Sequence, residues 1–293
     1  MTDRSPKPVR FVPVTRFVPA LVPSAVSRYT AEEVTKNVYL GPARILQHTG
    51  LTPAVREMVL EAPQVATAAA PGQFVHLAGD WERDPLLRRP FSLGRVDRQA
   101  GTINVFFRVV GRGTRRLAAL NPGQTVNLLG PLGRGFSLPA GEWLLAGGGL
   151  GIAPLLFLAE EGRRLNRPLT ALLGARTGAE LFGLSAFQEA CGAVRTATDD
   201  GSAGRHGTVA DLLDAHLEGR DLPGPTVFAC GPKPFLRRAA GWSSRGLRVE
   251  VSLEENMACG LGACRGCVVA TPGGGYENVC TSGPVFPATE VSI

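Results

Sequence analysis

Four cysteines toward the C-terminal end of the chain have a spacing that could hold an iron-sulfur cluster. They are Cys259, Cys264, Cys267 and Cys280, in the pattern C-x4-C-x2-C followed at a distance by the fourth cysteine. This order is typical of plant-type [2Fe-2S] proteins, in which a single loop supplies three of the thiolates. Glycines alternate with these cysteines, and glycine lets a backbone curl closely around a cluster. The stretch therefore predicts a [2Fe-2S] site.

Four cysteines have two other common uses. A structural zinc site more usually shows two C-x2-C pairs, and here only Cys264 and Cys267 form one. A disulfide framework suits a small secreted chain, whereas this chain has 293 residues and six cysteines. The spacing favours iron-sulfur over both, and a zinc-stabilised binding module without a redox role is the alternative from another class.

A first candidate for flavin binding is the extended segment RRPFSL, residues 88–93. Alternation along a strand puts Arg89 and Phe91 on one face. The guanidinium of Arg89 suits a diphosphate, while the hydroxyl of Ser92 can meet a polar ring edge. An ordinary strand entry with surface arginines would look the same.

A second candidate is the turn formed by Gly111, Gly113 and Thr114, which directly precedes the helical stretch TRRLAAL. Glycines before a helix N-terminus expose amides to an anion. Such turns also occur without a ligand, but two of these loops in one domain make a flavin diphosphate plausible.

Nucleotide-type turns follow in the second half of the chain. The run GGGLGIAP follows a strand and is a G-x-G-x-x-P variant whose glycines let a phosphate approach the next helix. The candidate residues are Gly147, Gly148, Gly149 and Gly151, together with Cys230, Gly231 and Pro232, whose thiol could lie near a nicotinamide. The acid expected about 20 residues further on for a ribose hydroxyl is absent, and Arg176 leaves NADP open.

The elements that position these motifs change character along the chain. Six short β-rich runs lie between residues 43 and 129, and only residues 114–120 look helical, which predicts a small antiparallel barrel. From residue 143 strands and helices alternate, which predicts a parallel α/β sheet of the Rossmann type. The predicted division is a flexible extension (1–34), an FAD-binding barrel (35–138), an NAD-binding α/β domain (139–250) and a small [2Fe-2S] domain (251–293).

Composition excludes little and adds no further site. The formal net charge of +6 is modest and the arginines are scattered, so a nucleic-acid partner is not expected. No apolar run reaches the roughly 20 residues of a membrane span. The histidines at 48, 76, 206 and 216 show no ligand spacing and are assigned to structure or surface.

Taken in order, RRPFSL, GRGT, GGGLGIAP with CGP, and the cysteine pattern resemble the ferredoxin reductase superfamily. The segments SLEENMACGLGACRGCVV and VCTSGPVF are more closely similar to the electron transfer subunits of type B dihydroorotate dehydrogenases. The resemblance covers about residues 35–293. It departs from the family pattern in the N-terminal extension and in Phe91, where an aliphatic residue is common.

The resemblance implies a flavin and iron-sulfur NAD-linked oxidoreductase subunit of pyrimidine (UMP) biosynthesis. It implies FAD, NAD and a [2Fe-2S] cluster, and a cytoplasmic heterotetramer with an FMN-containing catalytic subunit. By position, Arg89 and Ser92 would contact the flavin, with Phe91 against it, and the Gly111 turn would cradle the diphosphate. The glycine run would face NAD, and Cys230 would border the nicotinamide. No acid-base residue for dihydroorotate is identified, and a ferredoxin-NADP reductase or hydrogenase subunit is the alternative within electron transfer.

Overall fold

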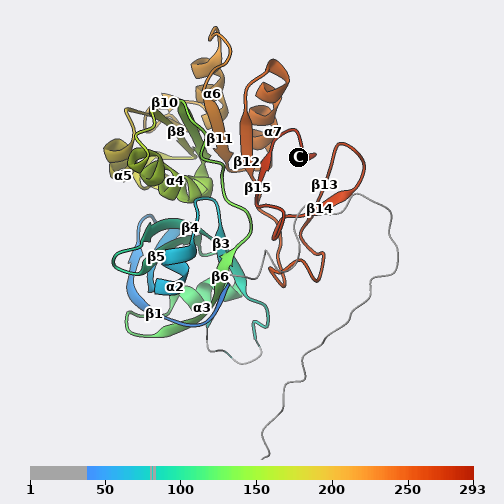
Figure 1. Ribbon diagram of the computed structural model, residues 1–293. Helices are drawn as coiled ribbons and strands as arrows, with labels where there is room; N and C mark the ends of the chain where they lie inside the picture. The colour runs from blue at the N-terminus through green and yellow to red at the C-terminus, as the bar shows by residue number, and fades with distance from the viewer. Residues whose placement is uncertain (1–37, 80, 82–83) are drawn as a thin grey trace, which may run out of the picture.

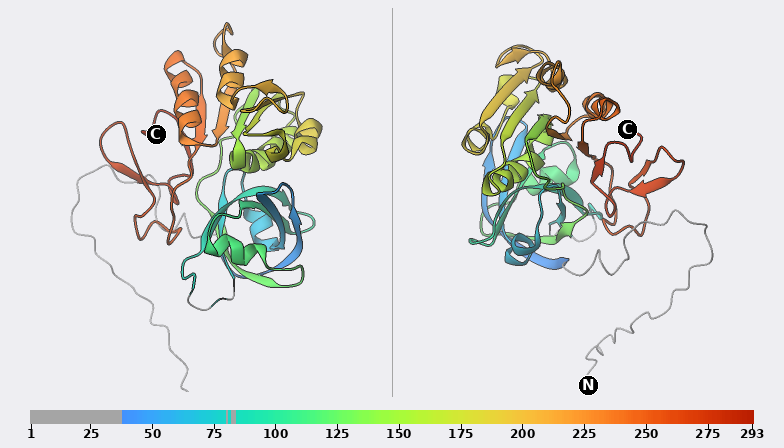
Figure 2. Two further views of the ribbon diagram at one scale, coloured as in Figure 1. Left: turned by 180° about the vertical axis from the view of Figure 1, so that it is seen from behind. Right: turned by 45° about the horizontal axis from the view of Figure 1, so that its top comes forward.

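The computed structural model describes residues 38–79, 81 and 84–293. The extension predicted for residues 1–34 lies outside the described residues. The rest of the chain forms a barrel, an α/β sheet above it, and a C-terminal part that runs beside both (Figure 1). Two further views show the same three parts from other sides (Figure 2).

The barrel is closed by six antiparallel strands in the order β1-β2-β5-β4-β3-β6. Their bounds are β1 Tyr39–Gly50, β2 Val55–Glu61, β3 Phe74–Ala78, β4 Arg89–Asp97, β5 Thr102–Arg108 and β6 Thr125–Leu132. Alternate apolar side chains, such as Ile45, Leu77 and Leu93, fill the interior and have 0–1% of their surface exposed. The six predicted strands are thus confirmed.

Two short helices accompany the barrel. Helix α3 (Arg112–Ala118) begins two residues before the predicted start at Thr114. Helix α2 (Pro63–Ala68) was not predicted, so the expectation of one helical stretch in this part is wrong. With six residues, α2 is too short to show a helical period, and its Pro63 stands at the first turn, where proline is tolerated.

The second part is a seven-stranded sheet in the order β10-β9-β8-β7-β11-β12-β15. All neighbours are parallel except β12 and β15. The strands are β7 Trp143–Gly148, β8 Leu169–Ala175, β9 Ala193–Thr198, β10 Arg205–His206, β11 Thr226–Cys230, β12 Val249–Ser252 and β15 Val285–Pro287.

Helices cover both faces of this sheet, as the alternation predicts. The helices are α4 Ile152–Arg164, α5 Leu184–Ala190, α6 Val209–Leu217 and α7 Lys233–Gly241, with short 3-10 turns η1 Gly149–Gly151, η2 Gly178–Glu180 and η3 Trp242–Arg245. Along β7, Trp143 and Leu145 pack in the core with α4 and α5, whereas Leu144 and Ala146 pack with α6 and α7. Strand β7 is therefore buried on both faces.

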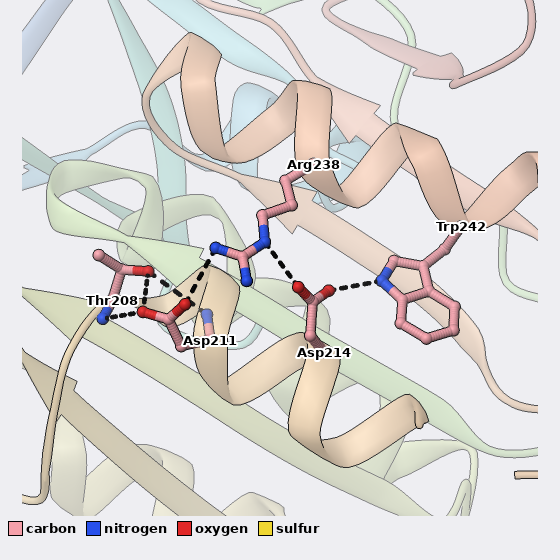
Figure 3. A network of polar contacts seen from close by, with 5 residues as sticks. All are labelled: Thr208, Asp211, Asp214, Arg238 and Trp242. Carbon is pink, nitrogen blue, oxygen red and sulfur yellow. Dashed lines mark hydrogen bonds and ion pairs between the residues drawn. The ribbon is translucent and has the colours of Figure 1, made fainter. Parts of the chain in front are cut away.

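A polar network holds α6 and α7 together on their outer side (Figure 3). Arg238 of α7 lies between two acids of α6, with its Nη1 2.9 Å from Asp211 and its Nε 2.6 Å from Asp214. The indole of Trp242 donates to Asp214, and Thr208 caps α6 by accepting from the Asp211 amide. These contacts fix the helix pair beside β11 and β12.

The C-terminal part is joined to the sheet rather than separate from it. Strand β12 runs through the predicted boundary between residues 250 and 251, and β15 returns to pair with β12. A small hairpin of β13 (Val268–Ala270) and β14 (Tyr276–Asn278) lies between them. In the described part of the chain, no helix is long and apolar enough to cross a membrane.

Candidate cofactor-binding site

The first candidate site lies where β4 meets the start of α3. A Cβ added to Gly113 would lie 2.5 Å from Nε and 2.8 Å from Cζ of Arg89, so the guanidinium rests directly on this glycine. The Thr114 hydroxyl accepts hydrogen bonds from the amides of Val110 and Gly111, each at 3.0 Å, which fixes the turn. The structure thus brings together the two segments that the sequence singled out separately.

Phe91 and Ser92 take opposite sides of β4. The Phe91 ring is 7% exposed and packs inside the barrel against Phe107, with 5.4 Å between ring centroids. Ser92 is half-buried and stands opposite Phe74 of β3. Of these two side chains, Ser92 is on the outer surface of the barrel.

The two nucleotide-type turns meet at the carboxyl ends of neighbouring strands. Residues Gly147 of β7 and Cys230 of β11 are paired, and a Cβ on Gly151 would lie 2.3 Å from the Cys230 carbonyl oxygen. Gly231 likewise lies against the backbone of Gly148. Only glycine permits such a close approach of the two backbones. The carboxyl ends of the strands, where the two turns meet, are the location at which parallel α/β sheets bind nucleotides.

Cys230 is a neutral thiol at this junction. It is 1% exposed, and burial followed by the negative charge of Glu254 raises its pKa well above the ordinary value. The thiol therefore stays protonated at neutral pH and offers a small, weakly polar contact rather than a nucleophile.

An acidic residue that the sequence did not single out lies just beyond β8. Glu180 in η2 forms ion pairs with Arg176, at 2.6 Å, and with Arg108 of the barrel, at 3.4 Å. The residue expected to meet a 2′-phosphate is thus paired with a carboxylate of its own chain. Glu180 lies further along the chain than the acid that usually binds the ribose hydroxyl, so the sequence pattern did not identify it.

The four candidate metal ligands lie together in the loop between β12 and β15. Cys267 and Cys280 are 3% and 1% exposed, Cys259 is half-buried and Cys264 is exposed. All six cysteines of the chain are free thiols. The group spans the edge of the molecule, with one pair of thiols inside and one toward solvent.

Backbone amides of this loop point at the cysteine sulfurs. Gly262 N donates to Cys280 Sγ at 3.2 Å, and Leu261 N and Cys264 N donate to Cys259 Sγ at 3.4 and 3.5 Å. Gly266 N donates to Cys264 Sγ at 3.5 Å. Such donors stabilise negative charge on sulfur.

Acidity of the thiols differs between the two pairs. Burial alone would raise the pKa of Cys259, but hydrogen bonds from Leu261, Cys264 and Ala263 lower it to about 7. Burial and the neighbouring Cys267 raise the pKa of Cys280 to about 12. Across the described ranges, no three His, Cys, Asp or Glu side chains surround a point where one ion could sit.

The loop also packs on the barrel. Phe74, Leu129 and Leu132 on the outside of β3 and β6 share one apolar cluster with Cys267 and Cys280. Strand β4, which carries the flavin-type motif, is the neighbour of β3 in the barrel (Figure 1). The cysteine loop therefore packs on the strand next to β4.

Comparison with known proteins gives a consistent result. Residues 254–292 match the family described as "Iron-sulfur cluster binding domain of dihydroorotate dehydrogenase B". The chain is 40% identical over 255 residues to the "Dihydroorotate dehydrogenase B (NAD(+)), electron transfer subunit" of Desulforamulus reducens, covering 85% of this chain and 97% of that protein. It is 44% identical over 244 residues to the protein of the same description from Bacillus caldolyticus, covering 81% and 92%.

Two solved structures with a similar fold are described as ferredoxin-NADP oxidoreductases or reductases. The NADH-dependent reduced ferredoxin-NADP oxidoreductase, from work on flavin-based electron bifurcation, superposes with a TM-score of 0.77 at 29% identity, covering 85% of this chain and 89% of that one. The ferredoxin NADP+ reductase from Neisseria gonorrhoeae, solved with FAD and NADP, gives 0.61 at 20% identity, covering 74% and 99%. The second likeness concerns the fold alone.

Proposed function

Because the chain belongs to the family of electron transfer subunits of NAD-dependent dihydroorotate dehydrogenase B, we propose that it carries electrons from the FMN of a catalytic subunit to NAD+. The reaction belongs to pyrimidine biosynthesis, and the chain is an oxidoreductase subunit that needs its partner for dihydroorotate oxidation. FAD, when bound, supplies the exchange between a hydride and single electrons, and a [2Fe-2S] cluster supplies one-electron transfer.

The observation that carries this proposal is the set of amides aimed at three of the four cysteine sulfurs, those of Cys259, Cys264 and Cys280. A [2Fe-2S] cluster has two irons and four thiolate ligands, so two pairs of cysteines suit it. Cys259 and Cys264 would hold the outer iron, and Cys267 and Cys280 the buried one. The same donors would offset the negative charge of a cluster.

Arg89 and the Gly111 turn are proposed to hold the FAD diphosphate. The guanidinium already lies on Gly113, so arginine and backbone amides face the same small region. Ser92, on the outer side of β4, would meet the polar edge of the flavin. Phe91 would support it from inside the barrel, where its ring packs on Phe107.

NAD is proposed to bind across the meeting point of the two glycine turns. Gly147, Gly148, Gly149 and Gly151 would face the diphosphate, and Cys230, Gly231 and Pro232 would border the nicotinamide. The pairing of Arg176 with Glu180 favours NAD over NADP, because a 2′-phosphate would meet a carboxylate as well as the guanidinium.

The partner is proposed to dock on the rim of the cysteine loop. Leu261 is 44% exposed there, and Ala263 and Arg265 lie between the ligands. Arg265 is exposed, and its φ of 53° lies in the left-handed region that a non-glycine residue rarely adopts. A heterotetramer with the FMN-containing subunit follows the family pattern, and six free thiols suit the cytoplasm.

The proposal is tested with purified chain, alone and with a catalytic subunit. The chain alone should show flavin and iron-sulfur absorbance and oxidise NADH with artificial acceptors, without forming orotate. Adding the partner should produce NAD-dependent orotate formation. Orotate formation by the chain alone would contradict the proposal. A colourless protein that contains zinc would favour the alternative, a zinc-stabilised binding module.

Sequence identity to known proteins favours the proposal over the alternative, a ferredoxin-NADP reductase or hydrogenase subunit. The similarity to dihydroorotate dehydrogenase B subunits reaches 44% over 92% of the relative, compared with 29% for the ferredoxin-NADP oxidoreductase. A partner pulldown decides directly, since the alternative would recover a protein without FMN.

A further inference from the structure

His76 is a buried histidine whose ring has no hydrogen-bond partner. Its side chain is 0% exposed in the middle of β3. Neither Nδ1 nor Nε2 has a hydrogen-bond partner among the described residues. Buried polar atoms are almost always hydrogen-bonded, and an unpaired one costs free energy. The two unpaired ring nitrogens of His76 therefore need a physical explanation.

The position of the ring supplies one. A Cβ on Gly260 would lie 2.9 Å from Cε1 and 3.1 Å from Nε2 of His76, so the Nε2 edge faces the loop directly after Cys259. On β3 itself, His76 stands opposite Pro90 of β4 and Leu129 of β6. The imidazole is therefore enclosed between the strand with the flavin-type motif and the cysteine loop.

The ring is neutral in this environment. Burial, followed by the positive charge of Arg88, lowers the pKa of His76 to about 4. At neutral pH the imidazole has one N–H donor and one acceptor nitrogen. The Nε2 edge lies against the backbone of Gly260, which does not accept a hydrogen bond from the ring.

We propose that the N–H of His76 is reserved for the cluster held by the neighbouring loop, and that it raises the reduction potential of that cluster. The inference rests on the proposed function, in which the four cysteines bind a [2Fe-2S] cluster. Sulfur atoms of a bound cluster are hydrogen-bond acceptors, and their negative charge increases on reduction. A donor stabilises the reduced form more, and hydrogen bonds to sulfur are among the determinants of cluster potential. His76 is thus a positioning and tuning residue contributed by the barrel.

The test compares two unbranched replacements in the full chain with its cofactors. His76→Gln keeps an N–H donor, whereas His76→Met does not. The cluster potential is measured by a redox titration followed by electron paramagnetic resonance. His76→Met should make reduction about tenfold less favourable, a shift of about 59 mV to lower potential for one electron. His76→Gln should recover part of that shift.

His216→Leu is the matched control. His216 is also buried, at 8% exposure, and its Nε2 also has no partner in the described chain, but it lies on α6, which packs on β7, β8 and β9. Its replacement should leave the cluster potential unchanged.

A second measurement detects the hydrogen bond itself. In wild-type chain labelled with 15N-histidine, pulsed paramagnetic resonance of the reduced cluster should show coupling to one ring nitrogen, which is absent in His76→Gln. Iron-loaded His76→Met with the wild-type potential would overturn the inference, as would a shift equal in both replacements or an absence of histidine coupling. Wild-type chain without any iron-sulfur cluster would instead overturn the proposed function.

Discussion

Replacing Gly113 with alanine should displace one side chain and leave the fold intact. The new methyl group would lie 2.5 Å from Nε and 3.0 Å from Nη2 of Arg89, distances that no stable contact permits. The obstructed atoms are the far end of a flexible side chain, so Arg89 can swing away at little cost. Because Gly113 is a helical position of α3, alanine itself should favour the helix by about 0.5–1 kcal/mol.

The expected effect is on FAD affinity rather than on stability. A hydrogen bond to a charged group contributes roughly 1.5–3 kcal/mol, and loss of the Arg89 contact with the diphosphate removes one such bond. FAD should therefore bind about ten- to a hundredfold more weakly. The melting temperature of the flavin-free protein should not fall.

Gly241→Ala is the control outside the flavin site. A Cβ on Gly241, the last residue of α7, would meet nothing within 4 Å, and its φ of −56° is ordinary helical backbone. FAD dissociation constants are measured by flavin fluorescence for wild type, Gly113→Ala and Gly241→Ala. Wild-type affinity in Gly113→Ala, or an equal loss in both variants, would refute the assignment of Arg89 to the diphosphate.

Three further outcomes test the other parts. Gly260→Ala should lower iron content and melting temperature, because Gly260 has a φ of 72° and lies against His76. Gly273→Ala should change neither, because the space around Gly273 is open. Equal behaviour of the two variants would contradict the packing of the loop. Glu180→Gln should release Arg176 and raise kcat/KM for NADPH relative to NADH by about tenfold, and an unchanged ratio would argue against its role in selectivity. Arg265→Ala should weaken complex formation with the catalytic subunit while dye-linked NADH oxidation stays the same, and equal loss of both activities would exclude this residue from the docking surface.

The sequence reveals whatever is encoded by local spacing. The four cysteines lie within one short stretch, and the six barrel strands show the alternation that a closed sheet requires. The same is true of the glycine turn after β7, which sits between a strand and a helix as predicted.

What the sequence hides depends on contacts between distant segments. His76 and Gly260 touch only because the barrel and the cysteine loop pack together, and nothing near His76 in the chain signals that contact. The contact of Glu180 with Arg108 joins the α/β sheet to the barrel, and no local spacing signals it. The three-residue strand β15 is too short to show a period, so its return to β12 could not be predicted.

The pairing of β15 with β12 also bears on how the chain is made. Until β15 has been synthesised, β12 is an open edge of the sheet, with backbone groups that could pair with another chain. Because synthesis runs from the N-terminus, the entire cysteine loop must leave the ribosome before that edge can be covered. A delay in folding of the loop would therefore leave the nucleotide sheet prone to aggregation. Cells that lack iron-sulfur assembly should accumulate this chain in the insoluble fraction, although the sheet itself binds no iron.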